Sequence, residues 1–223
     1  MTSTPPRPTH APNPGRWSDQ FVINILKLCE NNRIKADLRS GLGLPVERCN
    51  RMHRYLVRRL PGEQHPEARR AHYGVAALIA ARPPRAREVE VERTATSGNQ
   101  PPATWHTRTN LGASLAAGVN TGLIRPGTAE SHLHLFSRQS SDALHQRLPA
   151  LTQHLLGGGV TVDWAVLLED LTWWNRDRDR RATRWMEAYY RALGHLADDP
   201  DDLAGQTPDS QPTDITNSTE ENL

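Results

Sequence analysis

The sequence predicts an all-α protein built from two small helical bundles packed together. Apolar residues recur at three- and four-residue spacing in most segments between residues 16 and 197, as they do on the buried face of a helix. A convincing alternation of apolar and polar residues with hairpin turns is missing there, and only residues 88–93 alternate weakly. A run of turn-forming residues, TATSGNQPPAT at 94–104, predicts a linker between the bundles.

The N-terminal bundle, residues 16–93, is expected to contain three helices. The first takes Ser18 as its N-cap and runs toward Leu38, where two nearby glycines stop it. The second opens at Pro45 and ends at Pro61-Gly62, and the third runs from Pro66 to Pro83. The C-terminal bundle, residues 105–197, is expected to hold helices at residues 111–119, 128–138, 142–156, 163–174 and 179–196.

The two ends of the chain differ in composition from this body. Residues 1–15 hold five prolines and no large apolar residue after Met1, which predicts a disordered arm. Residues 198–223 hold eight acidic side chains and no Lys or Arg, which predicts a disordered, solvated acidic tail. Without that tail, residues 1–197 carry 27 basic against 17 acidic side chains, a formal charge of +10.

The basic body is almost entirely arginine, since only Lys27 and Lys35 are lysines. Arginine binds phosphate through two parallel hydrogen bonds, so the bias favours nucleic acid as a partner. A GC-rich genome would produce the same bias, so composition leaves both explanations open. The spacing of three arginines favours nucleic-acid binding, because Arg51, Arg54 and Arg58 recur every three or four residues and would project from one helix face.

The sequence offers no catalytic or metal-binding constellation, and we expect neither enzyme activity nor a cofactor. His132 and His134 are two residues apart, a spacing that sends them to different helix faces. The neighbours Glu169 and Asp170 point about 100° apart on a helix and form no joint site. No apolar run reaches the roughly 20 residues that span a bilayer, and no signal peptide is recognisable, so we expect a cytoplasmic protein.

A tryptophan pair closes the helix expected at 163–174. Trp174 continues its apolar stripe and Trp173 lies at the border of that stripe. Packing explains both residues, while Trp173 also suits a stacking platform for an unpaired base.

From residue 111 onward, the order of motifs resembles the CasB family, the small subunits of type I-E CRISPR Cascade complexes. The strings that carry the resemblance, together with the earlier IKADLRSG, are LGASLAAGV at 111–119, AESHLHLFSRQSSDAL at 129–144, VDWAVLLEDLTWWNRDRDRR at 162–181 and WMEAYYRAL at 185–193. The likeness extends over roughly residues 17–196, and residues 163–174 are its most specific part.

The resemblance implies an all-α, non-catalytic ribonucleoprotein subunit of antiviral defence, usually present as a pair. Its partners would be a second copy of itself, the large subunit and the backbone subunits of Cascade, the guide RNA and the target DNA. Basic side chains would steady the guide–target duplex and the displaced strand without reading bases. The matching nucleic-acid-binding positions are Lys35, Arg39, Arg138, Arg147, Arg176 and Arg178.

This chain departs from the family pattern at one position. Relatives commonly have Arg after the acidic residue of AESHL, where this chain has Ser131 and His132. Imidazole is mostly uncharged at neutral pH, so the phosphate contact would be weaker here or supplied from elsewhere, for example by Arg138.

A stand-alone DNA-binding regulator of the helix-turn-helix type is the alternative function. Residues 42–45 permit the short turn that such a motif needs. The helix expected after that turn presents mainly arginines of the phosphate-binding kind, rather than the Asn, Gln and Arg mixture of a recognition helix.

Overall fold

The computed structural model describes residues 16–60, 62–84, 86 and 107–197. These residues form helices and no strand, which confirms the all-α prediction. The predicted arm, linker and acidic tail lie outside the described residues, as does the weak strand candidate at 88–93.

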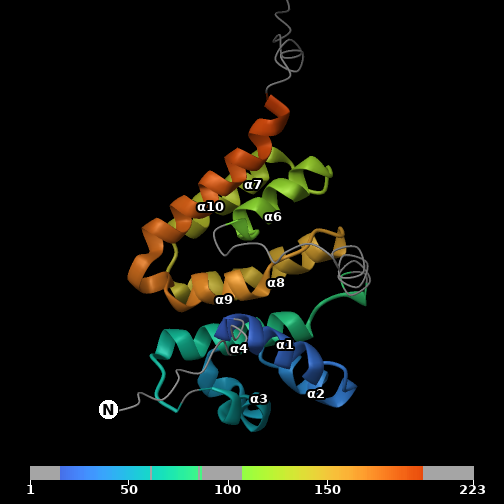
Figure 1. The fold of residues 1–223 in the computed structure, drawn as a ribbon, viewed down its shortest axis with the longest axis vertical. Coiled ribbons are helices and arrows are strands. Elements are labelled where there is room, and N and C mark those ends of the chain that lie inside the picture. The colour runs from blue at the N-terminus through green and yellow to red at the C-terminus, as the bar shows by residue number, and fades with distance from the viewer. Residues whose placement is uncertain (1–15, 61, 85, 87–106, 198–223) are drawn as a thin grey trace, which may run out of the picture.

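Four α-helices and two short 3-10 turns are formed by the described residues up to Ala80 (Figure 1). They are α1 (Trp17–Leu28), α2 (Asn32–Arg39), η1 (Val46–Arg48), α3 (Asn50–Leu56), η2 (Val57–Arg59) and α4 (Pro66–Ala80). From residue 107 onward the described helices are α6 (Leu111–Asn120), α7 (Pro126–Ser137), α8 (Ser141–Gly157), α9 (Trp164–Thr172) and α10 (Trp174–Ala197).

The first predicted helix is in fact two helices, because Asn31 interrupts it. Its side-chain Oδ1 accepts hydrogen bonds from the backbone N–H groups of Arg33 and Ile34, which makes Asn31 the N-cap of α2. The expected N-cap Ser18 was also wrong. Arg16 occupies the N-cap position of α1, and the Ser18 hydroxyl instead donates to Glu169 on α9 over 2.9 Å.

The second predicted helix is shorter than expected. Residues 46–48 and 57–59 form 3-10 turns, so that α3 itself covers only Asn50–Leu56. The later helices follow their predicted ranges closely, and Asp163 is the N-cap of α9, accepting from Ala165 and Val166. The last helix begins earlier than predicted, at Trp174, and bends at Asp177, whose φ of −139° and ψ of 34° are not helical.

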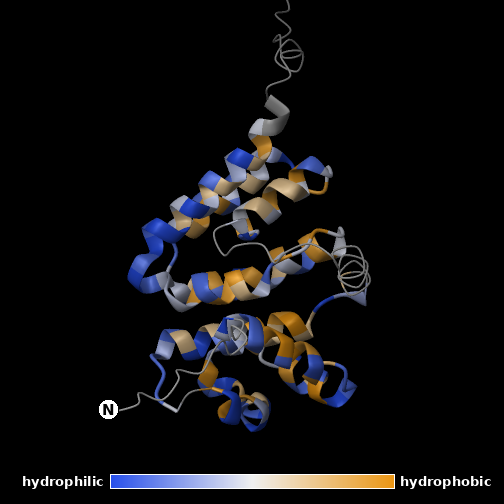
Figure 2. Ribbon diagram, viewed as in Figure 1, coloured by the Kyte–Doolittle hydropathy of each residue, from blue (hydrophilic) through white to orange (hydrophobic). Residues whose placement is uncertain are grey.

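Helices from both sides of the predicted linker pack together. α9 lies against α1 and α4, while α10 lies against α6 and α7 (Figure 1). The chain passes from one group to the other at the break between α9 and α10. Apolar residues line the inner faces of both groups (Figure 2), and one continuous buried core includes Trp174, Trp185 and Tyr189 of α10. The linker itself lies outside the described residues, so the domain boundaries along the sequence stay a prediction.

One glycine allows the close contact between α6 and α10. A Cβ atom at Gly112 would collide with the backbone carbonyl of Trp185. The two helix backbones therefore approach each other at a distance that only glycine permits.

Candidate nucleic-acid interface

Two of the predicted phosphate-binding residues lie on α2. Lys35 and Arg39 are four residues apart and so share one side of this helix. Arg39 is exposed and Lys35 is half-buried. The Tyr55 hydroxyl on α3 donates a hydrogen bond to Oδ2 of Asp37 over 2.8 Å, which holds α3 beside α2.

The α3 region adds three more cations at the same end of the molecule (Figure 1). Arg51 and Arg54 lie on α3, while Arg58 follows on the η2 turn because the helix ends at Leu56. All three are exposed. Among the described residues, neither these arginines nor Arg39 forms an ion pair, so their guanidinium groups remain available to phosphate.

A second group of cations gathers where the α7–α8 loop meets the start of α10. The Trp174 indole donates to the backbone carbonyl of Gln139 over 3.0 Å. In return, Oδ1 of Asn175 accepts from the backbone N–H of Ser141, also over 3.0 Å. These two hydrogen bonds fix the loop against the helix start.

Arg138, on that loop, therefore lies close to the helix start that carries Arg176 and Arg178. All three side chains are exposed. Arg178 forms an exposed pair with its neighbour Asp179 over 3.2 Å, an interaction of small free energy that a phosphate readily replaces.

Arg147 lies on the exposed side of α8 and influences a histidine of α7. Burial lowers the pKa of His132, and the positive charges of Arg147 and His154 lower it further. His132 is therefore neutral at pH 7 and supplies no positive charge at this position. The same influence indicates that Arg147 lies near His132.

Two arginines of the basic run 176–184 have a structural role instead. Asp170 on α9 is fully buried, and its Oδ1 accepts from Arg184 over 2.6 Å and from Arg181 over 3.1 Å. Its Oδ2 accepts from the Trp185 indole over 2.7 Å. Burial raises the pKa of Asp170, while Arg184, Trp185 and Arg181 oppose that rise by stabilising the carboxylate.

Glu169 and Asp170 point to different helices, as their adjacency predicts. Glu169 pairs with Arg16 and Ser18 at the start of α1, whereas Asp170 faces α10. In the described part of the chain, no group of three His, Cys, Asp or Glu side chains is placed to hold a metal ion. No described helix combines the length and apolar character needed to cross a membrane.

Sequence reasoning missed Arg108. Its guanidinium donates to both carboxylate oxygens of Asp163 and to Asp19, each over 2.7 Å, and so joins the starts of α9 and α1. The two carboxylates lie 55 and 89 residues away along the chain. Local sequence spacing holds no signal for such a contact.

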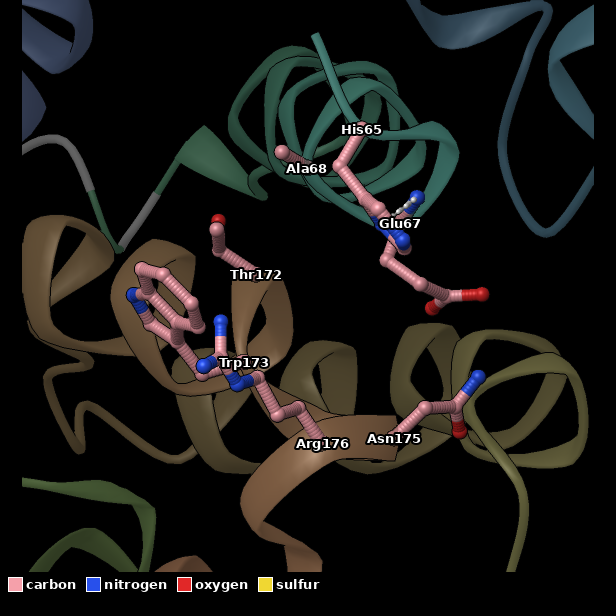
Figure 3. Close-up of a pocket in the computed structure, with 7 residues that line it drawn as sticks. All are labelled: His65, Glu67, Ala68, Thr172, Trp173, Asn175 and Arg176. Atoms are coloured by element: carbon pink, nitrogen blue, oxygen red, sulfur yellow. Dashed lines mark hydrogen bonds between the residues drawn. The ribbon is translucent and has the colours of Figure 1, made fainter.

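Trp173 is partly exposed, with 43% of its surface accessible, whereas Trp174 is fully buried. The guanidinium carbon of Arg176 lies 5.5 Å from the centre of the Trp173 ring. Both residues border a pocket at the start of α10 (Figure 3).

The nine predicted site residues thus fall into two groups and one outlier. Lys35, Arg39, Arg51, Arg54 and Arg58 share the α2–α3 end. Arg138, Arg176 and Arg178 share the α7–α8 loop and the start of α10, and Arg147 lies further along α8.

Comparison with known proteins defines the class to which this fold belongs. Two chains of solved structures titled as CRISPR RNA-guided surveillance complexes match it, the second in a pre-nicking state. The first has 31% identity and a TM-score of 0.68, the second 33% and 0.71; each match covers 83% of this chain and 98% of the other. The crystal structure of M. ruber CasB has the same fold, with 23% identity, a TM-score of 0.64, and coverage of 82% and 97%.

The family model of the CRISPR-associated protein Cse2 matches residues 35–190. This chain therefore belongs to the Cse2 family, also called CasB, and the resemblance seen in its sequence is confirmed. A comparison with curated protein sequences found no match.

Proposed function

We propose that this chain is the small, non-catalytic subunit of a type I-E CRISPR effector complex, Cascade. In it the chain would bind sugar–phosphate backbones without reading bases, and would stabilise the guide–target duplex and the displaced strand. Its partners would be the large subunit, the backbone subunits, a second copy of itself, guide RNA and target DNA, all in the cytoplasm. Membership of the Cse2 family and the likeness to chains of surveillance complexes support this assignment.

The exposed arginines without carboxylate partners carry the nucleic-acid part of the proposal. Arg39, Arg51, Arg54 and Arg58 stand on a helical scaffold held by the Tyr55–Asp37 hydrogen bond. Arg138 and Arg176 stand on a second scaffold held by Trp174 and Asn175. Rigid helices that present cations contact phosphates, and such contacts position a protein on a strand without specifying its sequence.

The geometry disfavours a stand-alone helix-turn-helix regulator. That motif joins its two helices by a turn of three or four residues. Here α2 ends at Arg39 and α3 begins only at Asn50, with a 3-10 turn between them. In addition, α3 spans only seven residues, which is short for a helix that reads a major groove.

A salt titration of binding to duplex and single-stranded DNA tests the proposal. Replacing Arg39 and Arg138 by Ala should each lower the slope of log affinity against log salt by about 0.7 to 0.9. Arg191→Ala is the matched control, because Arg191 is also exposed but lies far along α10, away from both groups. Slopes unchanged by R39A and R138A in folded protein would remove these residues from the interface.

A further inference from the structure

A pocket lies between the start of α4 and the junction of α9 with α10, and its volume is about 490 Å³. His65, Glu67 and Ala68 border it from α4, while Trp173, Asn175 and Arg176 border it from the junction (Figure 3). A volume of this size lies within the range that holds small organic ligands. The proposed backbone-binding function makes no use of this pocket.

The aromatic side of the pocket is suited to stacking. Trp173 keeps 43% of its surface accessible, although Trp164, Trp174 and Trp185 are buried nearby in the sequence. The Arg176 guanidinium lies beside the indole ring, 5.5 Å from its centre, and points toward the same space in Figure 3. An indole and a guanidinium plane together form the surface on which proteins stack single-stranded bases.

Glu67 supplies a hydrogen-bond acceptor from α4, across the pocket from Trp173, and Asn175 supplies a donor from the same side as Trp173 (Figure 3). Oε2 of Glu67 is shielded from solvent and has no hydrogen-bond partner among the described residues. Asn175 uses its Oδ1 to accept from the backbone of Ser141, so its amide NH2 group remains as the donor. The Watson–Crick edge of each nucleobase presents both donors and acceptors, whereas a phosphate presents only negatively charged acceptors, which Glu67 would repel.

We propose that this pocket binds one unpaired nucleobase, stacked on Trp173 beside Arg176 with its edge facing Glu67 and Asn175. The inference rests on the proposed function, because the strand would be delivered by phosphate contacts to Arg138 and Arg178 on the adjoining surface. The combination of groups favours this occupant, because Trp173 and Arg176 line the pocket and Arg178 lies on the adjoining surface, as a single strand of nucleic acid with both bases and phosphates would require. The site adds a contact with a base to an interface that otherwise contacts backbone.

The test compares two single-stranded DNAs of about six nucleotides, one with bases and one abasic throughout, bound to the full-length chain. Wild type should bind the strand with bases more tightly. Trp173→Ala should lower the affinity for that strand by about 5- to 140-fold, the range that loss of one stacked base implies. The affinity for the abasic strand should stay unchanged. Trp173→Phe should retain part of the difference, since a phenyl ring still stacks.

Tyr190→Ala is the matched control, because Tyr190 is an aromatic residue of α10 with 48% of its surface exposed and lies outside the pocket. Equal binding of both strands by wild type would contradict the proposal that the pocket binds a base, and would leave the proposal of backbone binding unchanged. A base preference that survives W173A would contradict the proposal for the pocket as well. Binding of neither strand at low salt would contradict both proposals, and loss of subunit assembly by W173A without loss of base preference would assign the pocket to a protein partner instead.

Discussion

The Trp185 indole on α10 donates a hydrogen bond to Oδ2 of Asp170 on α9 over 2.7 Å, and both residues are buried. The second oxygen of the same carboxylate accepts from Arg184 and Arg181. Because α9 packs against α1 and α4 while α10 packs against α6 and α7, this single carboxylate links the two helix groups.

Asp170→Ala should therefore lower the free energy of unfolding by about 3 kcal/mol. It leaves the buried indole N–H without an acceptor and removes the anion from two partly buried guanidinium groups. Urea unfolding followed by circular dichroism measures the change. Asp179→Ala is the control, since among the described residues Asp179 pairs only with Arg178, at the surface. This substitution should lower the free energy of unfolding by less than about 0.5 kcal/mol.

Arginines of the basic segment 176–184 should separate into two classes. Arg181→Ala should lower the free energy of unfolding by about 1.5–3 kcal/mol, because it removes a charged hydrogen bond to buried Asp170. Arg176→Ala should change that free energy by less than about 0.5 kcal/mol and should reduce the salt slope of DNA binding. Measuring unfolding and binding on both variants checks this. A loss of stability in R176A equal to that in R181A would contradict the assignment.

Gly112→Ala should lower the free energy of unfolding by about 3 kcal/mol or more, because the added Cβ would collide with the backbone carbonyl of Trp185. This carbonyl cannot move without shifting α10. Gly127→Ala is the matched control in α7, where the added Cβ meets no atom within 4 Å. The control should be neutral or more stable by about 0.5–1 kcal/mol, since alanine favours helix. Thermal or urea unfolding of both variants compares them. Equal stability of the two would mean that α6 and α10 do not approach so closely.

Two buried histidines predict a loss of stability in mild acid. Burial lowers the pKa of His145 to about 3, with a further contribution from the charge of Arg70. Burial also lowers the pKa of His72 to about 4, against the opposing hydrogen bond to Ala68. Since the folded pKa values lie below the unfolded value near 6.5, the stability these groups contribute is complete above pH 6.5 and declines as the pH falls below it.

Between pH 7 and pH 5 each histidine should remove about 2 kcal/mol from the free energy of unfolding. Urea unfolding at the two pH values measures the summed effect of both histidines on the free energy of unfolding. His145→Leu should remove about half of this pH dependence. His134→Leu serves as control, because His134 is exposed. A free energy that stays constant or increases toward pH 5 in the wild type would contradict the account.

Helix content and the exposure of the predicted phosphate-binding arginines were readable from the sequence because both depend on local spacing. The Leu-striped α8 and the Asp163 cap of α9 appeared as predicted. The interruption of the first helix was missed because Asn31 stands inside an apolar period that continues on both sides. A single side chain that caps the next turn outweighs that period.

Contacts across the fold were beyond local reasoning. Arg108 joins Asp19 and Asp163, and the sequence gives no sign that these residues meet. Likewise, Arg176 and Arg181 look alike in the basic run, and only the packing of α10 on Asp170 separates a free cation from a structural one. The pocket of Trp173 and Glu67 combines residues more than 100 positions apart, so only the fold brings its two sides together.

We propose that exposed arginines on a rigid helical body bind phosphate chains regardless of sequence. Affinity of the full-length chain for two DNAs of equal length and unrelated sequence, measured from low to physiological salt, tests it most directly. We expect the two affinities to agree within about tenfold and to fall steeply together as salt increases. A preference for one sequence of more than about 2 kcal/mol, or an affinity that does not depend on salt, would contradict it.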